Sequence, residues 1–600
     1  MKADQIKENY SSDAANFILL VAKEEKLLLY LSVLRFFSFT GGLVIIWFGF
    51  TYTVFTGILS VTIISVLFFY LLKLYSNHSE KKEFLGNLAI INQNESDAVS
   101  GDLSAFEAGN SYIDTSHDFS NDVDLFGNSS LFQYLNRTVT GYGRDILAGW
   151  LCDPFPLSPE LILRQEAIRE LALKHRWRHE FMAYGMKKPL EKSHITGLLE
   201  WMGETSVIKS SSIKKILIYI LPAAAILSLL LFGLGILHYS VFTFIFLLNL
   251  LYIAAGLKRI NEIHNKLSRK YSYLSSIDRL LKVFDNEIFK SKILTIIKQN
   301  ISGSNVSAAV SVRKLSRLIQ TFDSRLNFLV GFILNGLLLW DYHSIYRLEK
   351  WKSEYKNLFP VWLEMLGQID AYVSLGNYAY NNPDFAFPLI SDKNRVFSAT
   401  KLGHQLIDKS ARICNDFSLE KPGTICVVSG ANMAGKSTFL RTIAVNYILG
   451  LSGAPVCAEE MTFIPLKLFT SMRTADSLSN NESYFYAELK RLKMLKSRLE
   501  KGEPVLFILD EILKGTNSAD KSMGSKLFLK RIIELGGTGL IATHDTSIGE
   551  METDHPGSVI NRCFEVEIDG EMIIFDYKLK NGITHKMNAA LLMKQMGILE

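Results

Sequence analysis

The chain has 600 residues, of which 48% are hydrophobic and 21% are charged, and its mean hydropathy is +0.15. At roughly 100–200 residues per domain, this length excludes a single small module, and the positive hydropathy indicates that apolar residues are concentrated in membrane spans. Because 65 Lys and Arg residues face 60 Asp and Glu residues, the net charge of +5 does not by itself identify a nucleic-acid-binding protein.

Two long uncharged runs follow a polar N-terminal segment, residues 1–35, which carries both signs of charge and lacks the pattern of a cleaved signal peptide. The first run, residues 36–72, is long enough at ~1.5 Å per residue to cross a ~30 Å hydrocarbon core twice, with a turn at 51–53. The second run, residues 216–257, has the same character. We therefore expect two α-helical transmembrane hairpins; the alternative is buried core helices of a large soluble protein.

Basic side chains flank both runs, and the positive-inside rule places such flanks on the cytoplasmic side of a membrane. A multi-pass membrane protein with cytoplasmic termini and a cytoplasmic C-terminal part is therefore predicted. A shorter apolar run, residues 326–340, would move the C-terminal part across the membrane as a fifth span, so we expect a buried or interfacial helix there. The flanking residues are Lys23, Lys26, Arg35, Lys73, Lys81 and Lys82 for the first run, and Lys209, Lys214, Lys215, Lys258 and Arg259 for the second.

Polar segments separate and follow the two runs. Residues 73–129 contain no Lys or Arg after Lys82, and their acidic residues are interspersed with Ser, Asn and Gly, which predicts a solvated acidic linker rather than an acidic binding site. Apolar and charged residues alternate at helical spacing in residues 130–215 and 258–399, which predicts a helical lever region in two parts. The second part is rich in Lys and Arg, as expected for a solvated helix face beside a membrane or for a nucleic-acid surface.

The last third, residues 400–600, alternates β-rich apolar runs with helical segments, which is typical of an α/β sheet with parallel strands. Residues 430–438 read GANMAGKST and match G-x-x-x-x-G-K-[ST] between a predicted strand and a predicted helix. The glycines let backbone N–H groups wrap phosphates, Lys436 can neutralise the β- and γ-phosphates, and Ser437 can hold Mg²⁺. The motif predicts a phosphate-binding loop.

Two further strands end in residues that suit phosphate chemistry. Residues 505–511, VLFILDE, form an apolar strand followed by two acids, which is a Walker B pattern. Asp510 would order the Mg²⁺ shell, and Glu511 would position or deprotonate the attacking water. His544 follows a third strand, where its ring can contact the γ-phosphate or the water; alone, it would be read as a structural histidine.

The strings GANMAGKST, LDEILKGTNSAD, IATHD and SLSNNESYFYAELKRL resemble the ATPase domain of the MutS family, which belongs to the ABC class of P-loop ATPases. The resemblance is strong over residues 400–597 and fainter over residues 130–151, which look like the start of the family's helical lever domain. It implies binding of ATP with Mg²⁺, hydrolysis of ATP, and a homodimer formed through the ATPase domains.

The resemblance also implies roles for single residues. Ser483 matches a serine that reaches the γ-phosphate bound by the partner, Asn415 marks the loop that borders the adenine, and Arg412 falls near where relatives often carry an aromatic or aliphatic base contact. Residues 515–518 match the turn that contacts the opposite protomer. The expected catalytic residues are Glu511, Lys436, His544 and Ser483; the expected nucleotide contacts are Gly430, Ala431, Asn432, Met433, Ala434, Gly435, Lys436, Ser437, Thr438 and Asn415; the expected Mg²⁺ ligands are Ser437 and Asp510.

The chain departs from the family pattern in its N-terminal part. No Phe is followed two positions later by Glu, as in the family's mismatch-reading wedge, and the second uncharged run interrupts the lever near the family's DNA-clamping segment. We therefore expect a membrane-anchored, MutS-like ATPase that moves helical levers and binds duplex or structured DNA without reading mismatches. The alternatives are a nucleotide-switched membrane scaffold or remodelling protein without DNA, and an ABC-type half-transporter.

Overall fold

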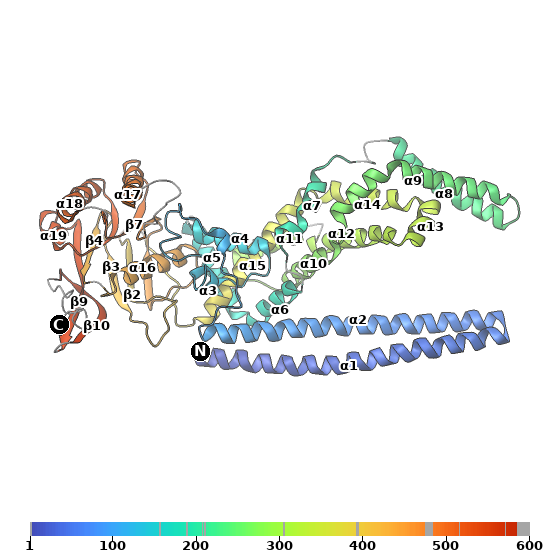
Figure 1. Cartoon of the computed structure of the whole chain (residues 1–600), viewed down its shortest axis with the longest axis horizontal. Helices are drawn as coiled ribbons and strands as arrows, with labels where there is room; N and C mark the ends of the chain where they lie inside the picture. Colours follow the sequence, from blue (N-terminus) through green and yellow to red (C-terminus); the bar gives the residue numbers. More distant parts are fainter. Residues whose placement is uncertain are drawn as a thin grey trace.

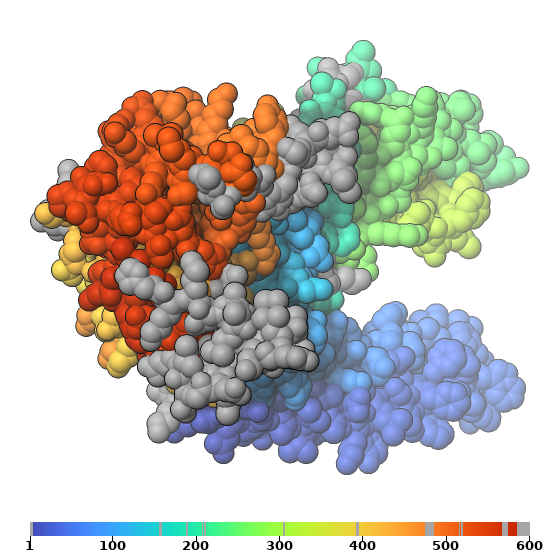
Figure 2. Space-filling view, turned by 60° about the vertical axis from the view of Figure 1, so that its left-hand side comes forward, coloured from blue at the N-terminus to red at the C-terminus, as the bar shows by residue number. Residues whose placement is uncertain are grey.

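The computed structural model describes residues 3–154, 158–187, 190–206, 208, 212–303, 307–391, 395–431, 433–473, 484–514, 517–569 and 572–584. The molecule is elongated, with an α/β domain at one end, a helical body in the middle and two groups of helices reaching to the other end (Figure 1). Figure 2 shows the N-terminal helices, in blue, and the green region of the chain as two separate projections from the body. The expected combination of a helical region and a C-terminal α/β domain is confirmed.

The N-terminal projection is a hairpin of α1 (Ala3–Tyr52) and α2 (Val54–Val99). Thr53 forms the turn and caps α2, because its hydroxyl accepts a hydrogen bond from the Thr56 amide (3.1 Å) while its own amide donates to Thr56 Oγ1 (3.1 Å). The turn therefore lies within the predicted interval, 51–53.

Both helices of this hairpin are much longer than the uncharged run. At ~1.5 Å per residue each helix is about 70 Å long, more than twice the ~30 Å hydrocarbon thickness. On the polar side of the run, Glu24 of α1 pairs with His78 (2.8 Å) and Lys81 (2.7 Å) of α2. Within the predicted polar N-terminal segment, residues 3–35 are continuous with the first apolar helix.

The expected linker at residues 73–129 is wrong. Residues 73–99 complete α2, and the acidic residues beyond it bind the α/β domain. Asp122 is buried and accepts hydrogen bonds from Thr470 Oγ1 (2.5 Å) and the Arg473 amide (2.7 Å), and Asp118 forms a bidentate ion pair with Arg498 (2.6 and 2.8 Å). The segment is an ordered joint, because its carboxylates meet arginines more than 340 positions away in the chain.

The helical body packs around one hydrophobic core that continues from the hairpin base into the α/β domain. The longest helix of the body, α15 (Leu358–Asn381), packs against α4 and α5 and runs toward the α/β domain (Figure 1). The other helices of the body are α3 (Leu131–Leu135), α4 (Gly141–Cys152), α5 (Ser158–Leu173), α6 (His175–Met186), α7 (Lys192–Gly203), α10 (Tyr271–Asn286), α11 (Lys292–Ser302), α12 (Ala308–Asp323) and α14 (Trp340–Tyr355).

The second projection contains α8 (Ser212–Gly233), α9 (Tyr239–Leu267) and the short α13 (Phe328–Leu338). Among the described helices, α1, α2, α8 and α9 are long and apolar enough to cross a membrane. Helix α13 packs on α8 and α9, meets α14 at a bend of 80°, and exposes Phe328, Leu329 and Phe332. Because eleven residues at ~1.5 Å span only about half of a ~30 Å core, α13 is too short to cross alone.

The α/β domain contains two sheets. The larger sheet has the strand order β10-β9-β4-β8-β7-β6, in which the neighbours from β9 to β6 are parallel and β10 is antiparallel to β9. The smaller sheet has the order β1-β5-β2-β3. The ordered segment that contains Asp118 and Asp122, here called the acidic joint, lies against β6, the edge strand of the larger sheet. There the Thr470 amide donates to the Asp118 carbonyl (3.0 Å).

The elements of this domain follow in chain order. They are β1 (Leu389–Ile390), β2 (Phe397–Leu402), β3 (Asn415–Leu419), β4 (Ile425–Gly430), α16 (Lys436–Leu451), β5 (Glu460–Phe463), β6 (Lys467–Ser471), α17 (Tyr484–Glu500), β7 (Val505–Asp510), α18 (Ser518–Glu534), β8 (Thr538–Thr543), α19 (Thr546–Gly549), α20 (Met551–Asp554), β9 (Val559–Asp569) and β10 (Met572–Asn581).

Candidate functional site

The phosphate-loop motif connects the buried strand β4 to the N-terminus of α16. Lys436, the first residue of α16, is buried, and its ammonium donates to the carbonyls of Gly430 and Ala431 (both 2.9 Å). Gly435 has φ +102°, and a Cβ at this position would lie 3.0 Å from the Tyr577 ring, so glycine is required for both conformation and space. The loop therefore aims a helix N-terminus and a lysine at one cavity.

The acidic and histidine residues come from two neighbouring parallel strands. Asp510 ends β7, Glu511 follows it, and His544 follows β8, whose Ala542 pairs with Asp510. His544 Nε2 lies 2.5 Å from Glu511 Oε1 and 3.3 Å from Lys436 Nζ. Because carboxyl ends of parallel strands share one sheet edge, three sequence motifs meet within hydrogen-bonding distance.

The electrostatics of this cluster favour an ionised carboxylate beside a cation. The hydrogen bond from His544 lowers the pKa of Glu511 to about 2, against the opposing effect of partial burial. Burial lowers the pKa of Lys436 to about 8, although Glu511 and Asp510 favour its charged form. The backbone of Glu511 has φ +52°, in the left-handed region that non-glycine residues seldom adopt.

The cluster opens into a cavity of about 420 Å³. The first turn of α16, including Ser437 and Thr438, forms one side, and Glu511 lies at the phosphate-loop end. Side chains that the sequence motifs do not include form much of the rest: His404, Ile407 and Ile413 from the loop between β2 and β3, and Phe564 and Tyr577 from β9 and β10. A volume of this size is within the ~300–1,000 Å³ range of ligand pockets.

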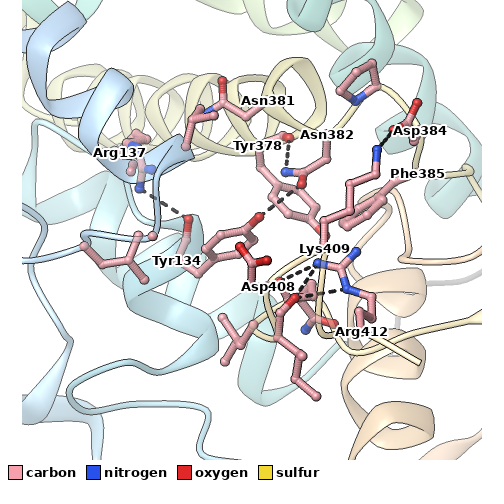
Figure 3. A pocket seen from close by; sticks show the side chains of 18 residues that line it. Tyr134, Arg137, Tyr378, Asn381, Asn382, Asp384, Phe385, Asp408, Lys409 and Arg412 are labelled. Carbon is pink, nitrogen blue, oxygen red and sulfur yellow. Dashed lines mark hydrogen bonds and ion pairs between the residues drawn. The ribbon is translucent and has the colours of Figure 1, made fainter. Parts of the chain in front are cut away.

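Asn415 lines the cavity but uses its side chain to hold the neighbouring strand. Its Nδ2 donates to the Tyr577 carbonyl (3.0 Å), and its Oδ1 accepts from the Leu579 amide (2.8 Å). Arg412 does not line this cavity; its guanidinium donates to the Ile407 carbonyl (2.8 Å) and the Gln405 carbonyl (3.2 Å) (Figure 3). Ile413 and Tyr577 therefore line the cavity, whereas Arg412, the residue that the sequence had suggested near the base, does not.

Several predicted residues fall outside the described part of the chain: Asn432, Ser483, Gly515 and Thr516. A nearby residue that sequence reasoning missed is Glu488 of α17, which is buried and accepts hydrogen bonds from the amides of Leu513 and Lys514. Glu488 thereby ties α17 to the turn after Glu511. Glu488 lies within the string SLSNNESYFYAELKRL that carries the family resemblance, but its role was not predicted, because an acidic residue in a helix is ordinarily solvated.

A divalent cation at this site would need oxygen ligands beside the phosphate loop. Among the described residues, no group of three or more His, Cys, Asp and Glu side chains is arranged to hold a metal. Mg²⁺ at phosphate sites is usually bound by one or two side chains together with waters and substrate phosphates, so the Asp510 carboxylate and the Ser437 hydroxyl fit that pattern.

Comparison with known proteins gives a family for this domain. A family model described as MutS domain V matches residues 426–597. The chain is 27% identical over 243 residues to a DNA mismatch repair protein MutS of Thermotoga petrophila, an alignment that covers 39% of this chain and 29% of the relative.

Two eukaryotic relatives give similar matches. DNA mismatch repair protein MSH3 of Eremothecium gossypii is 29% identical over 42% of this chain and 25% of its own length, and MutS protein homolog 4 of Homo sapiens is 28% identical over 31% and 21%. The chain therefore spans less than a third of the length of each of these three relatives. The matched region contains the phosphate loop, the two acids and the histidine. The C-terminal α/β domain of this chain therefore belongs to the MutS family as its domain V.

Proposed function

We propose that this protein is a membrane-anchored MutS-type ATPase that works as a homodimer and uses ATP binding and hydrolysis to move its helical levers. The observation that carries the proposal is the meeting of Lys436, Glu511 and His544 at one sheet edge, in a molecule whose opposite end exposes apolar helices. The names of the relatives support a role in processes resembling DNA mismatch repair.

In this proposal, Lys436 and the α16 N-terminus hold the ATP phosphates, while Ile413 and Tyr577 contact the base. Glu511, ionised and hydrogen-bonded to His544, orients the attacking water and accepts its proton. Mg²⁺, held by Ser437 and Asp510, would neutralise developing charge on the phosphates. Ser483 and residues 515–518 of the partner subunit would complete the site, so hydrolysis would separate the two domains.

Membrane anchoring is supported by the exposed side chains of the two projections. Large apolar residues such as Phe36, Trp47, Phe69, Phe244 and Leu251 are each more than half exposed, and such extended apolar surfaces are unfavourable in water. The apolar ends of both projections point away from the α/β domain (Figure 1), so one bilayer can receive both. Basic flanks on the α/β side fit the positive-inside rule.

Nucleotide affinity should depend on pH through Lys436. In the free protein its pKa is about 8, whereas bound phosphates favour the charged form and raise that pKa. Between pH 7 and pH 9 free Lys436 loses its proton, so affinity for an ATP analogue should fall by about tenfold, with proton uptake on binding. Titration calorimetry in two buffers of different ionisation enthalpy measures both effects. Lys436→Arg, which stays charged, should remove the dependence; a dependence unchanged in that variant would contradict this assignment.

Glu511→Gln should separate binding from hydrolysis. We expect turnover to fall by at least roughly 10²-fold, because the amide cannot accept the water's proton, while ATP affinity is retained. Sedimentation of the variant with ATP should show dimers that do not dissociate. Glu534→Gln, at the exposed end of α18, is the matched control and should behave as the parent. Parent-like turnover in Glu511→Gln would exclude its role as the base.

The membrane topology can be tested with single cysteines in a background in which Cys152 and Cys414 are replaced by serine. Tyr52→Cys and Leu234→Cys lie at the exposed tips of the two projections, and Met523→Cys lies on α18 of the α/β domain. An impermeant maleimide added to intact cells should label the two tip cysteines, and Met523→Cys only after permeabilisation. Equal labelling of all three in intact cells, or of none, would contradict two membrane-crossing hairpins.

DNA binding is a second candidate function, favoured by the names of the relatives and by exposed basic residues of the lever. Arg259 and Lys266 pair with Glu204, and Arg279 pairs with Glu80. Within the described part of the chain, Lys258, Arg269 and Lys282 are exposed and form no ion pair.

Duplex and branched DNA should then bind with an affinity that falls as the salt concentration rises. The substitutions Lys258→Gln, Arg269→Gln and Lys282→Gln should each reduce the slope of log K against log salt by about 0.9. Fluorescence anisotropy with and without ATP measures this. Absence of binding at low salt would remove the DNA function and leave the membrane scaffold or remodelling role.

A further inference from the structure

Helix α13, which packs on α8 and α9 in the second projection (Figure 1), carries an apolar face that is largely exposed. No charged residue occurs between Arg325 and Asp341, and Phe328 is 83% exposed. The other exposed apolar side chains of this segment are Leu326, Leu329, Val330, Phe332 and Ile333. A contiguous apolar face of this kind marks a contact with protein or with a membrane, because it is unfavourable in water.

The position of α13 along α9 indicates what covers this face. Phe332 packs on Phe246 of α9, with ring centroids 5.4 Å apart, and the Gly336 carbonyl accepts a hydrogen bond from Asn249 Nδ2 (2.7 Å). Asn249 precedes Lys258, the basic flank of α9, by ~14 Å, and Phe246 precedes it by ~18 Å, at ~1.5 Å per residue. In the proposed topology the hydrocarbon begins near Lys258, so both contacts lie near the middle of a ~30 Å core. The lipid that covers α9 would therefore also cover α13.

The two ends of α13 return to the cytoplasmic side of this projection. Arg325, before α13, forms an ion pair with Asp341, which follows it (3.0 Å). Arg325 also donates to Asn261 (2.9 Å), which lies beyond Lys258 on α9. The flanking helices α12 and α14 pack on each other, and the chain turns at Leu339, whose φ is +47°. The segment therefore enters and leaves on one side, as a re-entrant helix does.

The backbone at both ends of α13 has polar partners, which a helix end at membrane depth requires because no water is present to pair it. At the N-terminus, the Asn327 side chain accepts a hydrogen bond from the Val330 amide (3.2 Å). At the C-terminus, the partner of the Gly336 carbonyl is Asn249, which is fully buried although it lies within an apolar run. Glycine is needed at this contact, since a Cβ on Gly336 would lie 2.1 Å from the Phe246 ring.

We propose that α13 is a re-entrant helix whose exposed face is occupied by lipid acyl chains of the cytoplasmic leaflet alone. The proposal rests on the membrane insertion of α8 and α9 proposed above, and it goes further by assigning a lipid contact to the lever region itself. Because α12 and α14 are joined directly to α13, a movement of the levers would displace lipid in one leaflet and leave the other leaflet in place.

Fluorescence quenching in phosphatidylcholine nanodiscs tests this contact. The full-length protein, with Cys152 and Cys414 replaced by serine, carries one cysteine labelled with an environment-sensitive fluorophore. The ratio of quenching by an acyl-chain nitroxide lipid to quenching by aqueous iodide should be at least roughly fivefold higher at Phe328→Cys than at Lys314→Cys, because the nitroxide is confined to the hydrocarbon. Lys314→Cys, exposed on α12, is the matched aqueous control, and Leu247→Cys, exposed on α9, marks the hydrocarbon.

Labelling in cells tests the re-entrant path. Lys314→Cys precedes α13 and Lys350→Cys follows it, on an exposed position of α14. An impermeant maleimide should label both only after permeabilisation, as for Met523→Cys. Labelling of Lys350→Cys but not of Lys314→Cys in intact cells would mean that the segment crosses the membrane, and would overturn the proposal.

Three quenching results would also overturn it. Stronger quenching of Phe328→Cys by iodide, with Leu247→Cys quenched by the lipid, would reject the re-entrant helix and leave the membrane anchoring in place. Quenching by iodide at both positions would reject the anchoring as well. Protection of Phe328→Cys from both quenchers would mean that protein, such as a second copy, covers the face. Leu329→Cys, also exposed, repeats the measurement if Phe328→Cys fails to fold.

Discussion

The buried ion pair between Glu95 and Arg137 fixes the geometry on which the rest of the molecule depends. The two side chains lie 2.5 Å apart, and neither is more than 3% exposed. Asn381, at the end of α15, donates to the other oxygen of Glu95 (2.8 Å) and accepts a hydrogen bond from Tyr10 of α1 (2.7 Å). Since a buried charge that loses its partner is strongly destabilising, this network keeps both hairpin helices attached to the body.

A second set of contacts joins this unit to the α/β domain. The acidic joint binds β6 through Asp118 and Asp122, β6 pairs with β7, and β7 ends at Asp510. A continuous path of backbone pairing and ion pairs therefore leads from the Walker B strand to the base of the N-terminal hairpin. In the proposed mechanism, a change at the nucleotide site would reach the apolar helices along this path, because ordered, charge-paired segments transmit displacement better than a solvated linker.

Sequence patterns predicted those parts of the structure that depend on residues close together in the chain. The uncharged runs, the hairpin turn at Thr53 and the edge where Lys436, Glu511 and His544 meet follow from charge, helix length and strand order. The acidic joint was missed because its carboxylates resemble a solvated linker until Arg498 and Thr470 are brought to them by folding.

The continuation of α1 and α2 beyond the apolar run was missed for the same reason, since Glu24 pairs with residues of the other helix. Ile413 and Tyr577 carry no motif, and only the packing of the loop between β2 and β3 beside the distant strand β10 places them at the candidate nucleotide cavity.

In the proposed mechanism, the nucleotide state of the α/β domain sets the position of the apolar helices. Spin labels at Leu234→Cys in both protomers of a Glu511→Gln dimer, with Cys152 and Cys414 replaced by serine, report this by pulsed electron resonance in nanodiscs. Distance distributions that differ by several ångströms between ATP and ADP are predicted. Identical distributions, with ATP binding and dimerisation demonstrated in the same sample, would contradict the claim.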